Sequence, residues 1–201
     1  MNEIFDLLDW KRRIFELYAE IRAAPEPEAA WGRWREVRDE LFGSHPSSPL
    51  PEAARIGFAG VPYFPYDPAL RVLAEVEAAE PQSLQIAGSV GSLVSFVRFA
   101  RARFALAGEQ LSLELYWLEG YGGGIFVPFR DATGGAETYG AGRYVLDSVK
   151  GADLGLEDGR LVLDFNFAYN PSCSYDDRWA CPLCPPPNRL AVPIRGGERL
   201  P

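Results

Sequence analysis

The stretch LVSFVRFARARFALAGEQLSLELYWL, residues 93–118, decides the fold of this chain. In its second half every other residue from 111 to 115 is leucine, and the residues between them are serine and glutamate. A period of two is typical of a β-strand that buries one face. The pair Gly108-Glu109 supplies a turn in the middle of the stretch. We therefore expect two adjacent strands, residues 93–106 and 111–118, joined by a short loop.

Further strand patterns follow residue 70 and precede residue 168, separated by glycine-rich turns. They cover residues 72–77, 84–86, 125–129, 143–146 and 161–167. Strands at short intervals, with few helical patterns between them, favour an antiparallel arrangement over a doubly wound sheet. The sequence thus predicts a mainly β protein of the α+β class. We expect an antiparallel β-barrel or barrel-like sandwich, and favour a closed or nearly closed barrel.

The N-terminal part has a different period. Apolar residues within residues 4–22 recur at spacings of three and four, which predicts an amphipathic helix. A second helix is expected from Pro27 to Gly43, because proline is tolerated in a first turn and glycine is a common stop. With 201 residues the chain can bury roughly 70% of its unfolded surface. We expect a single domain, residues 1–201, in which the helices of residues 1–43 pack on a β-rich part, residues 52–201.

Composition narrows the classes of partner. The net charge is −8, and no run of basic residues interrupts it, so nucleic acid is not expected as a partner. Acidic residues at positions 3, 6 and 9 stand where a signal peptide would be basic and then apolar. No run of about eighteen apolar residues is present, so we expect no membrane insertion and a cytoplasmic location. Three cysteines are an odd and small number, which favours reduced thiols.

Short polar and aromatic motifs in both halves of the chain resemble one family. In the second half they are YGAGRY (139–144), DFN (164–166), AYNP (168–171), Cys173 and CPL (181–183). In the first half they are RD (38–39), HP (45–46), SPL (48–50) and YFPYD (63–67). On these residues the chain resembles domain-of-unknown-function family 1684, an uncharacterised prokaryotic family, over nearly its whole length. The resemblance implies that these polar residues matter together, but it implies no activity. Cys184 departs from the family pattern.

Polar side chains concentrate between residues 139 and 188. The candidate ligand-binding residues are Tyr139, Arg143, Asp164, Asn166, Asn170, Tyr175 and Asn188. Glycines beside Arg143 permit close backbone approach, and a guanidinium there favours a carboxylate or phosphate. The leading hypothesis is a β-barrel that binds a small anionic or polar molecule, its mouth closed by residues 170–188. Two structural alternatives stay open: Asp164 and Asn166 hold loop backbone, and Arg143 pairs with Asp164.

The alternative function is a Cys/His-dependent enzyme. Cys173 or Cys181 would be the nucleophile and His45 the base, with Asp39 or Asn170 orienting the imidazole. No cofactor is predicted. A Cys3His zinc site built from His45 and the three cysteines is a further alternative, as is a Cys173–Cys181 disulfide under oxidising conditions. A redox dithiol is disfavoured, because Cys181 lies in a proline-rich loop instead of opening a helix. The identity of the small molecule and the oligomeric state stay open.

Overall fold

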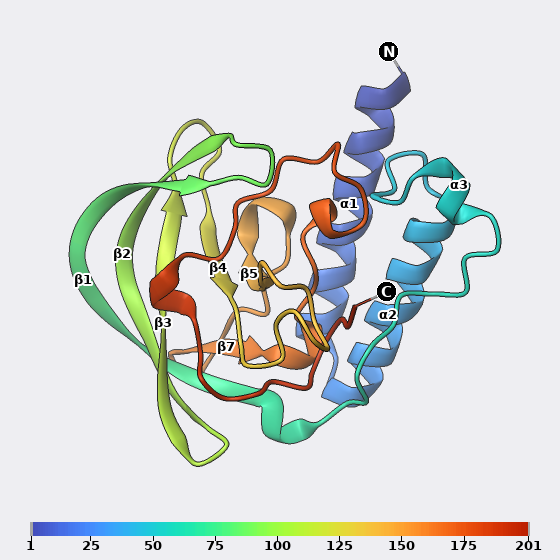
Figure 1. The fold of residues 1–201 in the computed structure, drawn as a ribbon. Coiled ribbons are helices and arrows are strands. Elements are labelled where there is room, and N and C mark those ends of the chain that lie inside the picture. The colour runs from blue at the N-terminus through green and yellow to red at the C-terminus, as the bar shows by residue number, and fades with distance from the viewer. Residues whose placement is uncertain (1, 201) are drawn as a thin grey trace.

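Two N-terminal helices pack beside a strongly curved sheet in the computed structural model, which describes residues 2–200 (Figure 1). The helices are α1 (Asn2–Ala23) and α2 (Pro27–Ser44), and a short helix α3 (Glu52–Arg55) follows. Ion pairs Arg13–Glu40 (2.6 Å) and Arg33–Glu20 (3.3 Å) run between α1 and α2, which fixes the two helices antiparallel. Both predicted helices are confirmed. Within residues 2–200 no helix combines the length and apolar character that crossing a bilayer requires.

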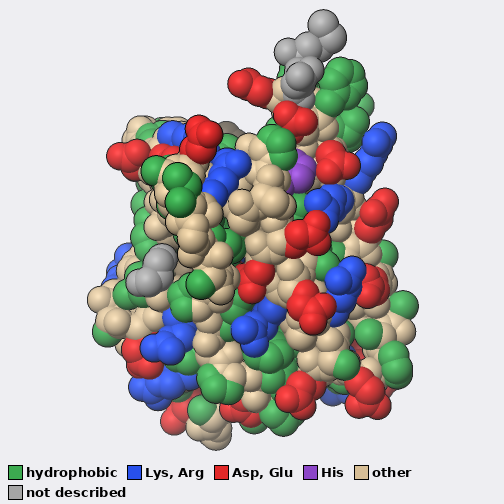
Figure 2. All heavy atoms as spheres, turned by 90° about the vertical axis from the view of Figure 1, so that its right-hand side faces the viewer, with side chains coloured by type: hydrophobic (Ala, Val, Ile, Leu, Met, Phe, Trp, Pro, Cys, Tyr) green, Lys and Arg blue, Asp and Glu red, His purple; other side chains and the backbone are tan. Residues whose placement is uncertain are grey.

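The helices cover one side of the molecule, where acidic and basic side chains are interspersed (Figure 2). Apolar side chains near the start of α1 are an exception, since Ile4, Phe5 and Leu7 are exposed. The opposite face of α1 and the inner face of α2 bury Ile14, Leu17 and Trp34 against the sheet and the loops beside it.

A seven-stranded sheet forms the rest of the fold. Its strands are β1 (Arg71–Ala87), β2 (Leu93–Leu106), β3 (Glu109–Leu118), β4 (Ile125–Phe129), β5 (Arg143–Asp147), β6 (Leu156–Glu157) and β7 (Arg160–Asp164). They lie in the order β5-β4-β3-β2-β1-β7-β6, and each neighbouring pair is antiparallel. The turn between β2 and β3 is made by Ala107 at φ 53° and Gly108 at φ 80°, one residue before the predicted pair, and β3 begins at Glu109. Positive φ at both central residues is what a tight hairpin with the strands' right-handed twist requires.

The prediction of a closed barrel is wrong, because the sheet stays open. Strands β5 and β6 are its two edges, and no strand pairing within residues 2–200 joins them. The C-terminal segment fills the gap instead: Leu190 and Ile194 belong to the core inside the curve of the sheet. Arg130, just after β4, forms an isolated parallel bridge with Arg189. Since the last part of the chain completes the core as an extended segment, closure by strand pairing is not needed.

The predicted strand at residues 161–167 is too long by three residues. Strand β7 ends at Asp164, whose carboxylate accepts a hydrogen bond from the backbone N–H of Asn166 at 3.0 Å. This bond starts a 3-10 helix at Phe165–Phe167. A side-chain acceptor two residues before a free N–H can replace a hydrogen bond of the strand ladder. Here the Asp164 carboxylate does so, and the strand ends.

Candidate functional site

A cavity of about 490 Å³ lies between the curved sheet and the C-terminal segment, and we call it the sheet cavity. The sheet contributes residues from β1, β2 and β3, among them Gln82, Arg98, Glu114 and Tyr116. The other wall is a proline-rich stretch, residues 183–187, which we call the lid segment. In Figure 1 this part of the chain runs across the strands. The volume falls within the range of about 300–1,000 Å³ that small-molecule sites occupy.

The polar centre of the sheet cavity is the carboxylate of Glu114, a buried residue of β3. Its Oε2 accepts a hydrogen bond from the Tyr116 hydroxyl at 2.9 Å, and its Oε1 accepts from Arg98 Nη1 at 3.3 Å. Arg101 Nη2 lies 3.4 Å from the same Oε1. Burial, together with the bond to Glu114, raises the pKa of Tyr116. Two guanidinium groups thus contact one carboxylate, and Arg98 is the one of the two that also lines the cavity.

Arg98 keeps donor capacity at this site. Its Nη2 donates to the backbone oxygen of Glu80 at 2.9 Å, whereas its buried Nε has no hydrogen-bond partner within residues 2–200. This Nε is enclosed by protein atoms, so the donors that Arg98 can offer a ligand are the second hydrogens of its two Nη atoms. The sequence reasoning missed Arg98, Glu114 and Tyr116. The signal was the alternation in β3, which places Glu114 and Tyr116 on the same face of a strand.

Asn188 holds the lid segment in place. Its Nδ2 donates to the backbone oxygens of Glu114 (3.0 Å) and Pro128 (2.7 Å), and its Oδ1 accepts from the N–H of Glu114 at 2.7 Å. The Tyr144 hydroxyl donates to the oxygen of Pro182 at 2.5 Å, at the start of the same stretch. Asn188 was predicted as a ligand-binding residue. The structure assigns its polar atoms to the backbone of β3 and β4, so it positions the cavity wall.

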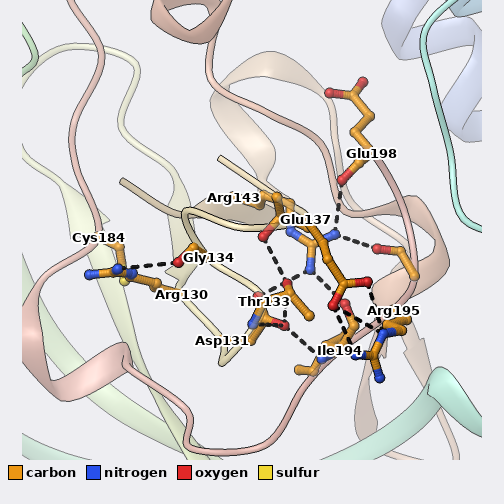
Figure 3. A network of polar contacts seen from close by, with 12 residues as sticks. Arg130, Asp131, Thr133, Gly134, Glu137, Arg143, Cys184, Ile194, Arg195 and Glu198 are labelled. Atoms are coloured by element: carbon orange, nitrogen blue, oxygen red, sulfur yellow. Dashed lines mark hydrogen bonds and ion pairs between the residues drawn. The ribbon is translucent and has the colours of Figure 1, made fainter. Parts of the chain in front are cut away.

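Arg143 lies in the interior, outside the sheet cavity, with 1% of its surface exposed (Figure 3). Its guanidinium donates to the backbone oxygens of Ile194 (2.8 Å), Glu198 (3.1 Å) and Gly196. The carboxylate facing it is Asp131, at 3.3 Å. The predicted pairing of Arg143 with Asp164 is therefore wrong. Burial lowers the pKa of Arg143. Three of its hydrogen bonds go to backbone oxygens of residues 194–198.

Asp164 and Asn166 hold backbone, as the structural alternative anticipated. Asn166 Nδ2 donates to Asp164 Oδ1 (2.8 Å) and to the oxygen of Asp67 (2.8 Å), and its Oδ1 accepts from the N–H of Asp67 at 3.0 Å. Burial raises the pKa of Asp164. Asp164 also lines a cavity of about 390 Å³ beside α1, together with Arg71.

Asn170 and Tyr175 meet at a buried carboxylate. Glu198 accepts hydrogen bonds from the Tyr175 hydroxyl (2.7 Å), from the N–H of Asn170 (2.6 Å) and from Arg38 on α2. A small cavity of about 70 Å³ adjoins this cluster. Asn170 Oδ1 has no hydrogen-bond partner among residues 2–200. The ion pair of Arg38 with Glu198 ties α2 to the end of the chain, and sequence spacing gave no indication of it.

Tyr139 lies beside the cysteines. Its hydroxyl is 3.8 Å from Cys173 Sγ, and the N–H of Cys173 donates to Cys181 Sγ at 3.4 Å. His45 lies elsewhere: its ring nitrogens bond Asp9 (3.2 Å) and the N–H of Ser47 (3.0 Å). No hydrogen bond or ion pair within residues 2–200 joins His45 to a thiol.

The residue expected to orient His45 is also engaged elsewhere. Asp39 accepts from the N–H of Val61 at 2.9 Å. Cys184 stands apart from the other thiols, with its Sγ 3.5 Å from the backbone oxygens of Pro185 and Asn188. Among residues 2–200, no three His, Cys, Asp or Glu side chains gather as a metal site would require. The donor set proposed for zinc therefore does not converge.

Comparison with known proteins agrees with the fold. None of the curated proteins matches the chain. The chain is similar to an uncharacterized protein of Haloarcula marismortui whose structure was solved by solution NMR, with 37% identity and a TM-score of 0.63. The match covers 86% of this chain and 93% of that one. The model of a family described as proteins of unknown function, DUF1684, matches residues 56–199. The chain belongs to the DUF1684 family, as its sequence motifs had suggested.

Proposed function

We propose that the protein binds a small polar molecule in the sheet cavity. The observation that carries this proposal is a buried carboxylate, Glu114, that lines a cavity of about 490 Å³ together with Arg98 and Tyr116. Binding sites of this size are mostly apolar, with a few placed polar groups that orient the ligand. The aliphatic wall from Leu84 and Ile86 completes that combination.

The charges define the class of ligand. Because two guanidinium groups face one carboxylate, an anionic group beside Arg98 would neutralise the excess positive charge. Hydroxyl or amino groups on the same molecule would donate to Glu114. The ligand class is thus a small molecule with one carboxylate or phosphate and at least one hydrogen-bond donor. The proposed site therefore centres on Arg98 instead of Arg143. Arg98 is on β2 and Arg143 on β5, and strands β3 and β4 lie between them in the sheet.

Native mass spectrometry of gently purified protein tests this proposal, followed by thermal shift with a panel of small carboxylates and phosphates. We expect a bound mass, or a panel compound that raises the Tm, in the wild type and in Glu77→Gln. Glu77 is half exposed and pairs with Arg103 on the same sheet, so it is a matched control. Arg98→Gln and Glu114→Gln should lose the bound mass or the Tm shift while remaining folded. Equal binding by all four proteins, or no binding by the wild type, would overturn the proposal.

The Cys/His-dependent enzyme receives less support. A thiol nucleophile needs a base within hydrogen-bond reach, and the hydrogen bonds of His45 go to Asp9 and Ser47. The cysteines still form a group of their own, but its chemistry does not require the imidazole.

A further inference from the structure

Two cysteines of the C-terminal loop are held in contact by the fold. The N–H of Cys173 donates to Cys181 Sγ at 3.4 Å, which places the two side chains next to each other. Ser89, in the turn between β1 and β2, fixes the Cys181 side of the loop. Its Oγ accepts from the N–H of Cys181 at 3.1 Å and donates to the oxygen of Trp179 at 2.8 Å. The bond from Cys173 and the two bonds of Ser89 together hold Cys181 beside Cys173.

The two sulfurs have different environments. Cys173 is partly exposed, and hydrogen bonding by the neighbouring side chains of Cys181 and Tyr139 lowers the pKa of its thiol to about 6. Cys181 is 3% exposed, and its bond to Cys173, together with burial, raises its pKa. At neutral pH Cys173 is thus the thiolate and Cys181 the protonated partner that donates to it. An accessible thiolate next to a protonated resolving thiol is the arrangement of a redox-sensitive pair.

A groove reaches the Cys181 side of this pair, while Cys173 itself is partly exposed at the surface. The groove has a volume of about 360 Å³ and is lined by Cys181 and Trp179 of the loop and by Trp10 and Lys11 of α1, with Lys150 beside them. The two lysines give the groove a positive charge that favours anionic species. Within residues 2–200 no third metal ligand and no imidazole lies with the two thiols. The chemistry to consider is therefore oxidation and reduction of the two sulfurs themselves.

We propose that Cys173 and Cys181 form a redox-active dithiol that hydrogen peroxide oxidises reversibly to an intramolecular disulfide. The Cys173 thiolate attacks one peroxide oxygen, the O–O bond breaks, and the leaving hydroxide takes a proton to become water. The Cys173 sulfenic acid is then attacked by the Cys181 sulfur, which gives up its proton. The S–S bond forms as the S–O bond breaks, and a second water leaves. In sum two thiols are oxidised by two electrons and one peroxide is reduced to two waters. A dithiol reductant restores the starting state by exchange. This inference is independent of the sheet cavity.

Cys184 supplies an internal control. Burial raises the pKa of its thiol to about 12, and its Sγ donates to the backbone oxygens of Pro185 and Asn188. After correction for the lower nucleophilicity of a more acidic thiol, Cys173 should be alkylated at neutral pH on the order of 100-fold faster than Cys184. The rate of Cys173 alkylation should rise with pH around a midpoint near 6.

The test treats the full chain with hydrogen peroxide at neutral pH and measures intact mass and linked peptides. The wild type and Cys184→Ser should both lose about 2 Da, with a Cys173–Cys181 linkage that a dithiol reductant reverses. Cys181→Ser should stop at a sulfenic acid on residue 173 that dimedone traps, and Cys173→Ser should react at neither residue. A disulfide to Cys184, disulfide-linked dimers, or alkylation of Cys173 no faster than that of Cys184 would overturn the proposal. The alkylation arm uses only the wild type, so it holds even where a variant fails to fold.

Discussion

Replacing Arg143 by methionine should destabilise the fold severely, because the guanidinium joins β5 to the last residues of the chain. The substitution leaves the backbone oxygens of Ile194, Gly196 and Glu198 without their donor and leaves Asp131 buried without its cation. Removing one partner of a buried ion pair costs about 3–5 kcal/mol, and each unsatisfied buried acceptor costs about 1–3 kcal/mol. These costs overlap, so we expect a loss of about 4 kcal/mol or more. That is a large share of the total for a typical domain.

Urea unfolding followed by tryptophan fluorescence measures this loss at constant m-value. The matched control is Arg103→Met, because Arg103 pairs with Glu77 at an exposed position of the same sheet and should cost less than about 1 kcal/mol. Asp131→Asn combined with Arg143→Met should cost clearly less than the sum of the two single changes, since both remove one interaction. A loss below about 1 kcal/mol for Arg143→Met, or strict additivity with Asp131→Asn, would refute a structural role and restore Arg143 as a ligand-binding candidate.

Three further outcomes follow from the described contacts. Asn188→Ala removes three hydrogen bonds at about 1 kcal/mol each, so unfolding experiments should show a loss of about 3 kcal/mol and hydrogen exchange should accelerate at the β3 amide that it binds. Because the raised pKa of Asp164 makes the folded state take up a proton before the unfolded chain does, stability from this group falls as pH rises through that pKa. The stability of Asp164→Asn relative to the wild type should therefore increase in urea unfolding as the pH rises above the ordinary pKa of an aspartate, whereas the exposed Asp158→Asn should show no such trend. Tyr175→Phe removes a hydrogen bond to the buried charge of Glu198 and should cost about 1.5–3 kcal/mol; an unchanged midpoint would contradict that role.

Local patterns predicted most of the elements. The hairpin within residues 93–118 and both N-terminal helices were recognisable because the spacing of apolar residues that identifies each one lies within one continuous segment. The open sheet was not predictable in this way. The gap between its two edge strands is filled by a C-terminal segment whose sequence has no strand period. The end of β7 depended on a single side chain, Asp164, which competes with the strand ladder.

The candidate site was predicted less well, for a physical reason. Sequence shows which polar residues exist but not which meet, so Arg143 could be matched with Asp164 although its partner is Asp131. Glu114 was overlooked because a charged residue in an alternating strand is usually assigned to the solvent-exposed face. In the structure the lid segment lies over Glu114. The sequence argument looked for a helix end that would lower the pKa of Cys181, whereas the thiol whose pKa is lowered is Cys173, through neighbouring side chains.

The ion pair between α2 and the end of the chain has a consequence during synthesis. Arg38 and Glu198 are separated by 160 residues, so at about 5–20 residues per second a ribosome needs about 8–32 s to deliver the partner after the arginine. Throughout that interval the aromatic face of α2 has neither the finished sheet nor its buried counter-charge. The packing of α2 therefore stays incomplete during synthesis, and folding completes only after translation has passed residue 198.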